Sequence, residues 1–394
     1  MNVGDIMKKL TILCLHMGYG GAENAIASLA NNLCNKYDIE IVSVYKLYDK
    51  EAYTLDKKIN VTYLMETDIA LRTDTYKKLL RSHKIFKLFK VLLRDYKINI
   101  FRLAKDTIDS YINVKNKKRL MINYIKNMNT DIVLSTRLEY NYYLSEYQPK
   151  AYKVAWEHNH GDIKYIREVI KSCNGVDRLV VVSKGLYDIY TSETNDLKIS
   201  YIPNVLDELP DKKSKLDNKS LVSVGRLVTV KGYNDMIDVM KIINEKDPSI
   251  TLEIIGDGDL KYDLKNKVKD LKLDKNIKLV GLKDKKYIND KLAKSSLFIS
   301  TSHSESFGLA VIEAMSAGVP VIAFDSAEGL TELIDNKNGI LIQNRNIEEM
   351  ANEIIELLDD KVRIKEMGKN AYNTSLNYTK DKVYDKWLKV MEDK

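Results

Sequence analysis

The sequence contains few of the residues that build disulfide-rich, zinc-binding or membrane-spanning proteins. Its 394 residues include three cysteines, five histidines and five prolines. Cys14, Cys34 and Cys173 are scattered without CxxC spacing, which argues against a disulfide framework and against a zinc site. No apolar run approaches the ~20 residues that span a bilayer, and Leu10–Leu15 is too short for a signal peptide. We therefore expect a soluble cytoplasmic protein without a metal centre.

The charge of the chain is nearly balanced overall but unevenly distributed. The 63 Lys and Arg residues exceed the 56 Asp and Glu residues, and a net charge of +7 is too small to indicate a nucleic-acid partner. Residues 76–105, here called the basic segment, carry ten basic residues and one acidic residue, a net charge of +9. The net charge of the rest of the chain is therefore −2. No base-stacking platform or recognition motif is evident, and a nucleic-acid-binding protein is poorly supported.

Short apolar runs alternate with longer amphipathic stretches through both halves of the chain. Their Val, Ile and Leu content predicts buried strands of parallel sheets with helices between them, which is an α/β architecture. Helices are expected at 233–244, 309–317 and 347–358. The expected strands are 10–15, 39–44, 61–64, 132–134, 153–156, 179–182, 221–224, 251–255, 277–280, 297–299, 319–323 and 340–342.

The polar stretch 207–220 predicts where two domains are joined. It contains Pro210 and lacks apolar periodicity, which is typical of an interdomain linker. We predict a Rossmann-like, doubly wound N-terminal domain over 1–206 and a second one over 221–378, facing across a cleft. A C-terminal helix over 379–394 would pack back on the first domain. In such folds ligands bind at the carboxyl ends of the strands.

Three glycines follow the first expected strand, in the run Met17-Gly-Tyr-Gly-Gly-Ala-Glu23. Gly18, Gly20 and Gly21 permit positive φ and bring backbone N–H groups to a helix N-terminus, which suits an anion or a closely packed sugar. The third glycine of the dinucleotide-binding G-x-G-x-x-G pattern is missing. A plain tight turn between strand and helix is the alternative.

Two cations follow the strand expected at 221–224, in the run Val224-Gly-Arg-Leu-Val-Thr-Val-Lys-Gly232. Arg226 leaves the end of the strand and Lys231 precedes a helix, so both side chains can converge on one ligand. A guanidinium fork and a lysine ammonium suit a diphosphate. Two unrelated surface cations are the alternative.

The most specific motif is the run SESFGLAVIEAMSAGVP in the second half. Glu305 and Glu313 are eight residues apart, which is about 12 Å along a helix, and both carboxylates can address one ligand. The amides of Phe307, Gly308 and Leu309 open this helix and offer its positive end to a phosphate. The alternative is a capped amphipathic helix with solvated acids, although the small residues that follow require close packing.

Two weaker features also follow expected strands. Asp257 and Asp259 could be taken for a metal-binding acid pair, but Gly256 and Gly258 favour a tight turn at the nucleotide end of the second domain. His158 ends a strand of the first half and can contact a phosphate or a sugar hydroxyl. A core or capping histidine is the alternative.

Together these residues resemble the retaining glycosyltransferases of family 4, which have the two-domain GT-B fold, and among them the bacterial surface-polysaccharide enzymes. The glycine loop, the Gly-Arg and Lys-Gly pair and the E-x7-E pattern occur in order and at suitable spacing. The resemblance covers almost the whole chain. It is strongest over 223–342 and weak over about 46–126.

The resemblance implies a role for each matching residue. Arg226 and Lys231 would bind the donor diphosphate, Glu305 would contact the donor sugar, and with His158 these form the expected catalytic set. No obligatory metal is implied, because these cations supply the electrostatic stabilisation, and no cofactor is implied, because the nucleotide-sugar is a substrate. The other implied donor contacts are Glu313 to the ribose, the Phe307, Gly308 and Leu309 amides to phosphate and sugar, Gly256, Gly258 and Val280 beside the base, Gly20 and Gly21 near the sugar phosphate, and Asn204 at the interdomain edge.

The expected reaction breaks the anomeric C–O bond of a nucleoside-diphosphate sugar, which we expect to be UDP-linked, and transfers the sugar to an acceptor hydroxyl. The leaving diphosphate gains charge as the bond opens, so the two cations and the helix end act mostly in the transition state. No carboxylate is placed as a covalent nucleophile. This favours substitution on one face of the sugar, with retention of configuration.

The basic segment points to the acceptor. On a helical wheel an aromatic-rich apolar arc adjoins a basic arc, which suits an anionic bilayer surface. An ordinary domain helix with a solvated basic face is the alternative. The apolar arc holds Ile85, Phe86, Leu88, Phe89, Leu92 and Leu93, and the basic arc holds His83, Lys84, Lys87, Lys90 and Arg94.

These observations predict a transferase that acts on a lipid-linked or cell-surface glycan at the cytoplasmic face of the membrane. A nucleotide-sugar epimerase on the same fold is one competing interpretation, and it would need no acceptor. A non-catalytic sugar-nucleotide-binding subunit is another, but such a subunit has no need for Lys231 and Glu305.

Overall fold

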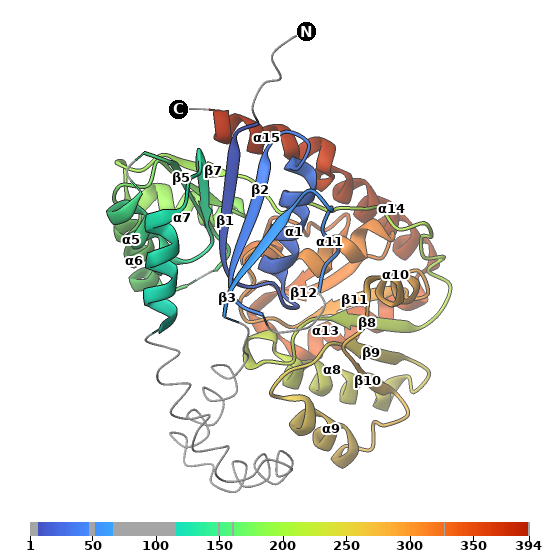
Figure 1. Cartoon of the computed structure of the whole chain (residues 1–394). Coiled ribbons are helices and arrows are strands. Elements are labelled where there is room, and N and C mark those ends of the chain that lie inside the picture. Colours follow the sequence, from blue (N-terminus) through green and yellow to red (C-terminus); the bar gives the residue numbers. More distant parts are fainter. Residues whose placement is uncertain are drawn as a thin grey trace, which may run out of the picture. The chain divides into compact units, whose positions relative to one another are not determined.

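The computed structural model describes residues 7–46, 52–65, 116–148, 150–159, 161–326 and 328–392 (Figure 1). The chain divides into two compact units, Met1–Trp156 with Arg167–Leu179, and Glu157–Ile166 with Val180–Lys394. The basic segment lies outside the described residues, so the amphipathic helix expected there stays a prediction.

A seven-stranded sheet has the strand order β3-β2-β1-β4-β5-β6-β7. Strand β1 pairs in parallel with β2 and with β4, so the sheet grows in both directions from its first strand. All six strands expected in this half are present, to within one residue at each end. The strands are β1 (Lys9–His16), β2 (Asp38–Tyr45), β3 (Asn60–Met65), β4 (Ile132–Ser135), β5 (Tyr152–Glu157), β6 (Arg178–Val181) and β7 (Ile199–Tyr201). Strand β7 was not expected, because three residues are too few to form a recognisable apolar run.

A six-stranded sheet in the second unit has the order β10-β9-β8-β11-β12-β13, and every neighbouring pair is parallel. The chain builds outward from β8 to β10, then returns to β11 and builds outward to β13. This doubly wound order confirms the α/β fold class. The strands are β8 (Ser220–Val224), β9 (Thr251–Ile255), β10 (Ile277–Gly281), β11 (Leu297–Ser300), β12 (Val321–Phe324) and β13 (Gly339–Ile342).

Several of the helices begin at side chains that cap them. Ser183 Oγ, Asp284 Oδ1 and Asn346 Oδ1 each accept a backbone N–H of the following first turn, which satisfies one of the unpaired donors there. The helices are α1 (Gly21–Leu33), α5 (Leu138–Tyr147), α6 (Ile163–Ser172), α7 (Lys184–Glu193), α8 (Tyr233–Lys246), α9 (Lys261–Asp270), α10 (Lys285–Leu292), α11 (Leu309–Ser316), α12 (Glu328–Thr331), α13 (Ile347–Asp359), α14 (Lys361–Ser375) and α15 (Lys380–Glu392), with 3-10 turns η1 (Thr229–Lys231), η2 (Gln343–Arg345) and η3 (Leu376–Tyr378).

The core of the second unit explains why its strands appear in the sequence as continuous apolar runs. In a parallel sheet with helices on both faces, strand side chains are buried on both sides. Leu221, Leu297 and Ile322 are fully buried in β8, β11 and β12. Helix α8 packs against α13, and α11 packs against α14. The result is a rigid platform whose strand ends carry the loops discussed below.

The stretch expected to be a linker forms neither helix nor strand over residues 207–219. It nevertheless packs on the second unit. Leu216 is buried with a left-handed φ of 54°, and the Ser214 backbone N–H donates to the Ala317 carbonyl at 2.8 Å. One buried leucine in a polar run has no periodicity to reveal it, so this contact could not be predicted.

All three cysteines are buried and none of them is in a disulfide, as the sequence predicted. Among the described helices, none combines the length and the apolar character that crossing a bilayer requires.

Candidate functional site

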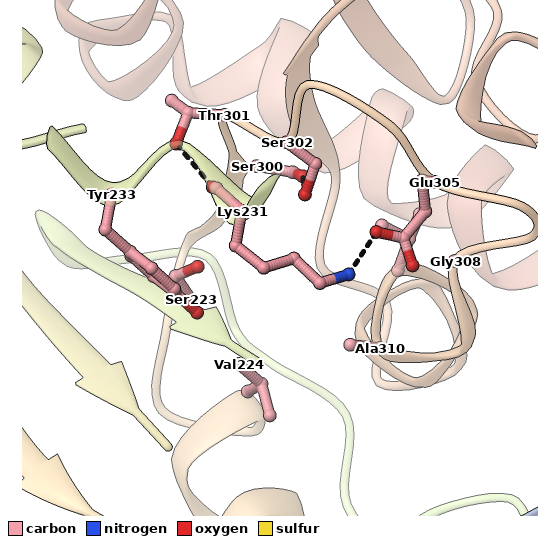
Figure 2. A pocket seen from close by; sticks show the side chains of 11 residues that line it. Ser223, Val224, Lys231, Tyr233, Ser300, Thr301, Ser302, Glu305, Gly308 and Ala310 are labelled. Carbon is pink, nitrogen blue, oxygen red and sulfur yellow. Dashed lines mark hydrogen bonds and ion pairs between the residues drawn. The ribbon is translucent and has the colours of Figure 1, made fainter. Parts of the chain in front are cut away.

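A pocket lies at the carboxyl ends of β8 and β11, the two strands between which the chain reverses its direction of winding (Figure 2). Ligands of doubly wound sheets bind at such switch points, because adjacent loops diverge there and leave a crevice. The pocket is lined by Ser223, Val224, Lys231, Tyr233, Ser300, Thr301, Ser302, Glu305, Gly308, Ala310 and Val311. It therefore brings together Lys231, Glu305 and Gly308 among the residues expected from the sequence.

Lys231 reaches this pocket because a glycine follows it. Gly232 has a φ of 65°, and a Cβ at that position would lie 1.9 Å from the Thr301 carbonyl oxygen. The bare glycine lets the Lys231 turn press against the loop after β11. Thr301 Oγ1 then donates to the Gly232 carbonyl at 2.9 Å, which fastens the two loops together.

The Lys231 ammonium forms an ion pair with the Glu305 carboxylate, as Figure 2 shows. The two side chains are 22% and 19% exposed, so water screens the pair only in part. A cation expected to hold a diphosphate and an acid expected to hold a sugar are thus neighbours. A ligand that enters the pocket meets both charges at once.

The loop that carries Glu305 is held from its backbone. The Gly329 N–H donates to the Glu305 carbonyl at 2.8 Å. Phe307 is buried edge-on against Tyr378, with ring centroids 5.6 Å apart, so its side chain is core and its amide is what remains for a ligand. Gly308 has a φ of 95° and is the N-cap residue of α11, so the amides of Gly308 and Leu309 lie at the positive end of that helix.

Hydroxyl groups make up most of the remaining polar lining. Ser223, Ser300, Thr301 and Ser302 surround the ion pair. Tyr233 is buried, and this burial raises the pKa of its phenol well above the ordinary value, so it stays a neutral hydroxyl. A pocket with one ammonium, one carboxylate and several hydroxyls is suited to a ligand with both phosphate and sugar groups.

Glu313 is held by a different lysine. Its carboxylate, on α11, forms an ion pair with the ammonium of Lys285 at the start of α10. Glu313 is 13% exposed and is not part of the pocket lining. The two glutamates of the E-x7-E pattern therefore have separate cationic partners. Lys285 has no sequence signal that could have identified it.

The glycine turn after β9 supports the loop that carries Arg226. A Cβ on Gly256, whose φ is 150°, would lie 1.9 Å from the Gly225 carbonyl oxygen, and one on Gly258 would lie 2.6 Å from that of Leu227. The glycines are therefore needed for close backbone packing. Arg226 itself is exposed and is not among the residues that line the pocket. Val280, which was expected beside the base, lies near the end of β10 and does not line the pocket either.

Asp257, the first acid of the pair in this turn, has partners other than a metal. Asp257 forms an ion pair with Lys261 at 2.7 Å and accepts the Gly258 N–H at 2.8 Å. In the part of the chain that the structure describes, no cluster of three His, Cys, Asp or Glu side chains could hold a metal ion.

The glycine loop of the first unit differs from the expectation. None of Gly18, Gly20 and Gly21 adopts a left-handed φ, and the backbone of Gly20 is extended, with a φ of 178°. A Cβ on Gly20 would lie 2.0 Å from the Glu23 carboxylate, which is the flexible end of a side chain and can move, so this contact does not by itself require glycine. Tyr53 also bonds to Gly20, accepting its N–H at 3.0 Å and donating to its carbonyl at 2.7 Å. A carboxylate here favours a sugar hydroxyl over a phosphate as the ligand of this loop.

His158 follows a buried acid at the end of β5. Glu157 accepts the Asn159 N–H at 2.6 Å and the Tyr165 hydroxyl at 3.1 Å. Burial raises the pKa of Glu157 above its ordinary value of 4.5, although these hydrogen bonds oppose the shift. His158 is half-buried next to it. Asn204 is buried after β7, and its Oδ1 has no hydrogen-bond partner among the described residues.

The raised pKa of Glu157 predicts a specific dependence of stability on pH. The folded protein holds this proton more tightly than the unfolded chain, so the free energy of unfolding falls as pH rises from about 4.5 through the higher folded-state pKa. Glu157→Gln removes this titration. Its free energy of unfolding should therefore decrease less than that of the wild type between about pH 4 and pH 8, measured by urea melts. Glu245→Gln, at an exposed position of α8, is the control, and identical curves for Glu157→Gln and the wild type would contradict the prediction.

Comparison with known proteins agrees with this geometry. Residues 207–374 match the family model described as glycosyl transferases group 1. An uncharacterized glycosyltransferase of Haemophilus influenzae is 26% identical over 98% of this chain and 100% of its own length. An uncharacterized glycosyltransferase of Methanocaldococcus jannaschii is 30% identical over 57% of this chain and 68% of its own. The poly(ribitol-phosphate) alpha-N-acetylglucosaminyltransferase of Staphylococcus aureus is 31% identical, and the chain spans only 45% of its length.

The fold also matches solved structures. Staphylococcus aureus TarM, in complex with fondaparinux, alpha-GlcNAc-glycerol and UDP, superposes with a TM-score of 0.76 at 18% identity, over 98% of this chain and all of that one. The two Rossmann-like sheets are thus those of the GT-B architecture, as the sequence predicted. From its family match, its relatives and its fold, the chain belongs to the group 1 glycosyl transferases.

Proposed function

We propose that this protein is a retaining glycosyltransferase that moves a sugar from a UDP-sugar to a hydroxyl of a lipid-linked or cell-surface glycan at the inner face of the membrane. The observation that carries the proposal is the Lys231–Glu305 ion pair, placed at the switch point of a doubly wound sheet beside the N-terminus of α11. Opposite charges and an anion-binding helix end in one pocket fit the two parts of a nucleotide-sugar.

In this proposal the cations act on the leaving group. Negative charge develops on the diphosphate as the anomeric C–O bond breaks. Lys231, Arg226 and the amides that open α11 would stabilise that charge, and such contacts contribute most when they strengthen in the transition state. Glu305 would accept hydrogen bonds from the sugar hydroxyls and orient the ring. The folded pocket holds both groups in place before the donor arrives, so little reorganisation is required.

The acceptor hydroxyl would attack from the face that the diphosphate leaves. The new glycosidic bond forms as the old C–O bond breaks, and the acceptor proton passes to the departing phosphate oxygen. Atoms and charges balance without a covalent enzyme intermediate or an added co-reactant. Glu313, held by Lys285, would bind the ribose hydroxyls of the nucleotide, and His158 would contact the sugar.

The relatives support the choice of donor and acceptor class. TarM is described with UDP and with alpha-GlcNAc-glycerol, and the Staphylococcus aureus relative is named for an acceptor that is a polyol-phosphate polymer. We therefore propose a UDP-sugar donor and a hydroxyl-rich surface polymer or glycolipid acceptor. The basic segment would bring the enzyme to an anionic bilayer.

A thermal-shift experiment tests the donor site. The protein would be melted with UDP-, GDP-, ADP- and TDP-sugars, beside Lys231→Ala and Glu313→Ala. A donor present at 100 times its dissociation constant adds about 2.7 kcal/mol to the free energy of unfolding. We expect UDP-sugars alone to raise the Tm of the wild type and to lose this effect in both variants. A shift with every class, or one that survives both substitutions, would contradict the assignment.

Product analysis separates the proposed transferase from the epimerase. Donor alone should give no isomerised nucleotide-sugar, whereas donor with a glycan acceptor should release UDP. Release of an isomerised sugar without acceptor would favour the epimerase instead.

Flotation with liposomes tests the membrane part of the proposal. The full chain should float with vesicles rich in anionic lipid and remain behind with neutral vesicles, and less of it should float at high salt. Equal recovery with both vesicle types would overturn the membrane role of the basic segment.

A further inference from the structure

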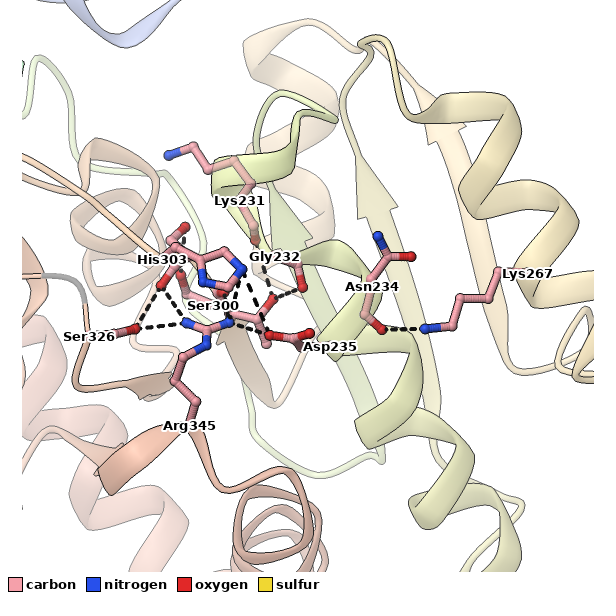
Figure 3. A network of polar contacts seen from close by, with 11 residues as sticks. Lys231, Gly232, Asn234, Asp235, Lys267, Ser300, His303, Ser326 and Arg345 are labelled. Carbon is pink, nitrogen blue, oxygen red and sulfur yellow. Dashed lines mark hydrogen bonds and ion pairs between the residues drawn. The ribbon is translucent and has the colours of Figure 1, made fainter. Parts of the chain in front are cut away.

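Arg345 is the centre of a polar network behind the pocket (Figure 3). Its guanidinium donates to the Thr301 carbonyl at 2.9 Å and to the Ser302 carbonyl at 3.1 Å. The same group forms an ion pair with Asp235 in the first turn of α8. One side chain therefore joins the loop after β11 to the helix that follows Lys231.

Two further contacts fix the orientation of the guanidinium. It lies over the ring of Phe324, 4.5 Å from the centroid, and it donates to Ser326 Oγ at 2.7 Å. His303 Nε2 lies 3.5 Å from the same group. The Arg345 side chain is 21% exposed, so it is not a solvent-facing cation. Its backbone is left-handed, with a φ of 53°, which is uncommon for a residue other than glycine.

The network leads directly to both members of the ion pair. Thr301, whose carbonyl accepts from Arg345, donates through its Oγ1 to the Gly232 carbonyl at 2.9 Å and to the Lys231 carbonyl at 3.3 Å. Ser302 lies three residues before Glu305 on the same loop. Arg345 is thus linked to Lys231 through a single residue, Thr301. It also binds the carbonyl of Ser302, near the start of the loop that carries Glu305. It touches neither pocket charge itself.

We propose that Arg345 is a positioning residue that sets the distance between Lys231 and Glu305, by holding the Thr301 and Ser302 carbonyls and Asp235 with its planar fork. The proposal rests on the function proposed above for the role of that ion pair. The sequence motifs do not include Arg345, because it follows β13 and is far along the chain from each of its partners.

A fork is needed at this position. Two adjacent carbonyls and a carboxylate lie around the guanidinium, and its nitrogens donate in fixed directions within one plane. A lysine ammonium is a single point donor and cannot serve all three acceptors in that geometry. Arg345→Lys keeps the positive charge and the ion pair with Asp235, and it removes the link between the carbonyls.

Hydrogen exchange of the unliganded protein tests the proposal without a substrate. Arg345→Lys should speed amide exchange over 229–232 and 301–308 by about tenfold, since charge-assisted hydrogen bonds that hold these loops closed are lost. Exchange in the core strands should stay as in the wild type. Arg363→Lys is the matched control, because Arg363 pairs with Glu353 at 3.3 Å on the surface of α14. If Arg345→Lys does not fold, Asp235→Asn is the second variant, because it removes the ion pair at the other end of the network. It should speed amide exchange over the same two segments.

UDP binding, measured by calorimetry, shows whether Arg345 acts through Lys231. Arg345→Lys should weaken UDP binding about tenfold in the wild-type background and have almost no effect in Lys231→Ala, because the positioned group is then gone. Equal losses in both backgrounds, or unchanged exchange over 229–232 and 301–308, would overturn the proposal. Absence of UDP binding by the wild type would instead overturn the proposed donor, and the exchange pattern would then decide the role of Arg345.

Discussion

Replacing Lys231 with alanine is expected to lower kcat by roughly 100- to 1,000-fold with little loss of stability. Removing one preorganised donor from a charge-stabilising site has an effect of that size in other enzymes. Lys231 is the cation that the pocket places beside Glu305 and the N-terminus of α11, and its contact with a leaving diphosphate would strengthen as charge develops. Initial-rate kinetics with the donor found by thermal shift would measure the change.

The effect of Lys231→Ala has to be separated from general damage to the fold. Lys246→Ala is a suitable control, because Lys246 bonds to Asn352 on the surface at 2.6 Å and lies outside the pocket. Its kcat should match that of the wild type. The double variant Lys231→Ala, Glu305→Ala should lose much less than the product of the two single effects, since each partner acts through the other. A tenfold or smaller loss for Lys231→Ala would show that the leaving group is stabilised elsewhere.

Gly256→Ala is expected to lower the free energy of unfolding by about 3 kcal/mol or more. Its φ of 150° disfavours any side chain, and the added Cβ would lie 1.9 Å from the Gly225 carbonyl oxygen. Backbone strain and overpacking each cost about 1–3 kcal/mol. The carbonyl belongs to the chain that leaves β8 toward Lys231, so UDP binding should weaken as well. Urea melts and calorimetry would measure the two effects.

Gly175→Ala is the matched control for this substitution. Gly175 also has a positive φ, 87°, but the nearest atom to its Cβ would be in the Ser145 side chain at 3.2 Å, and the nearest backbone atom, the Ser145 Cα, would be 3.7 Å away. We expect a loss of about 1–2 kcal/mol from backbone strain alone. If Gly175→Ala and Gly256→Ala destabilise equally, the close approach of the two strand-end loops is not what requires glycine at 256.

Local structure was largely predictable from the sequence, because its causes are local. The strand at 251–255 was predicted with the bounds of β9, and the strand at 221–224 differs from β8 by one residue. A continuous run of branched apolar side chains between turns allows few other structures. The loops that begin with Gly225 and Thr301 could likewise be placed after strands, which is where doubly wound sheets bind ligands.

The partners within the site were not predictable, because they are distant in the chain. Lys231 and Glu305 are 74 residues apart, Lys285 and Glu313 are 28 apart, and Asp235 and Arg345 are 110 apart. The conformation of the glycine loop was likewise not predictable from nearby residues. Its residues were identified, but the conformation of Gly20 depends on Tyr53, which is 33 residues further along.

The sequence by itself therefore determined the α/β class, the positions of most strands and of a few helices, and the residue types suited to a nucleotide-sugar. The tertiary structure decided which of those residues meet. The physical reason is the strand order: β8 lies beside β11 although β9 and β10 separate them in the chain. This neighbourhood results from how the sheet buries its apolar surface as a whole, and no short run of residues encodes it.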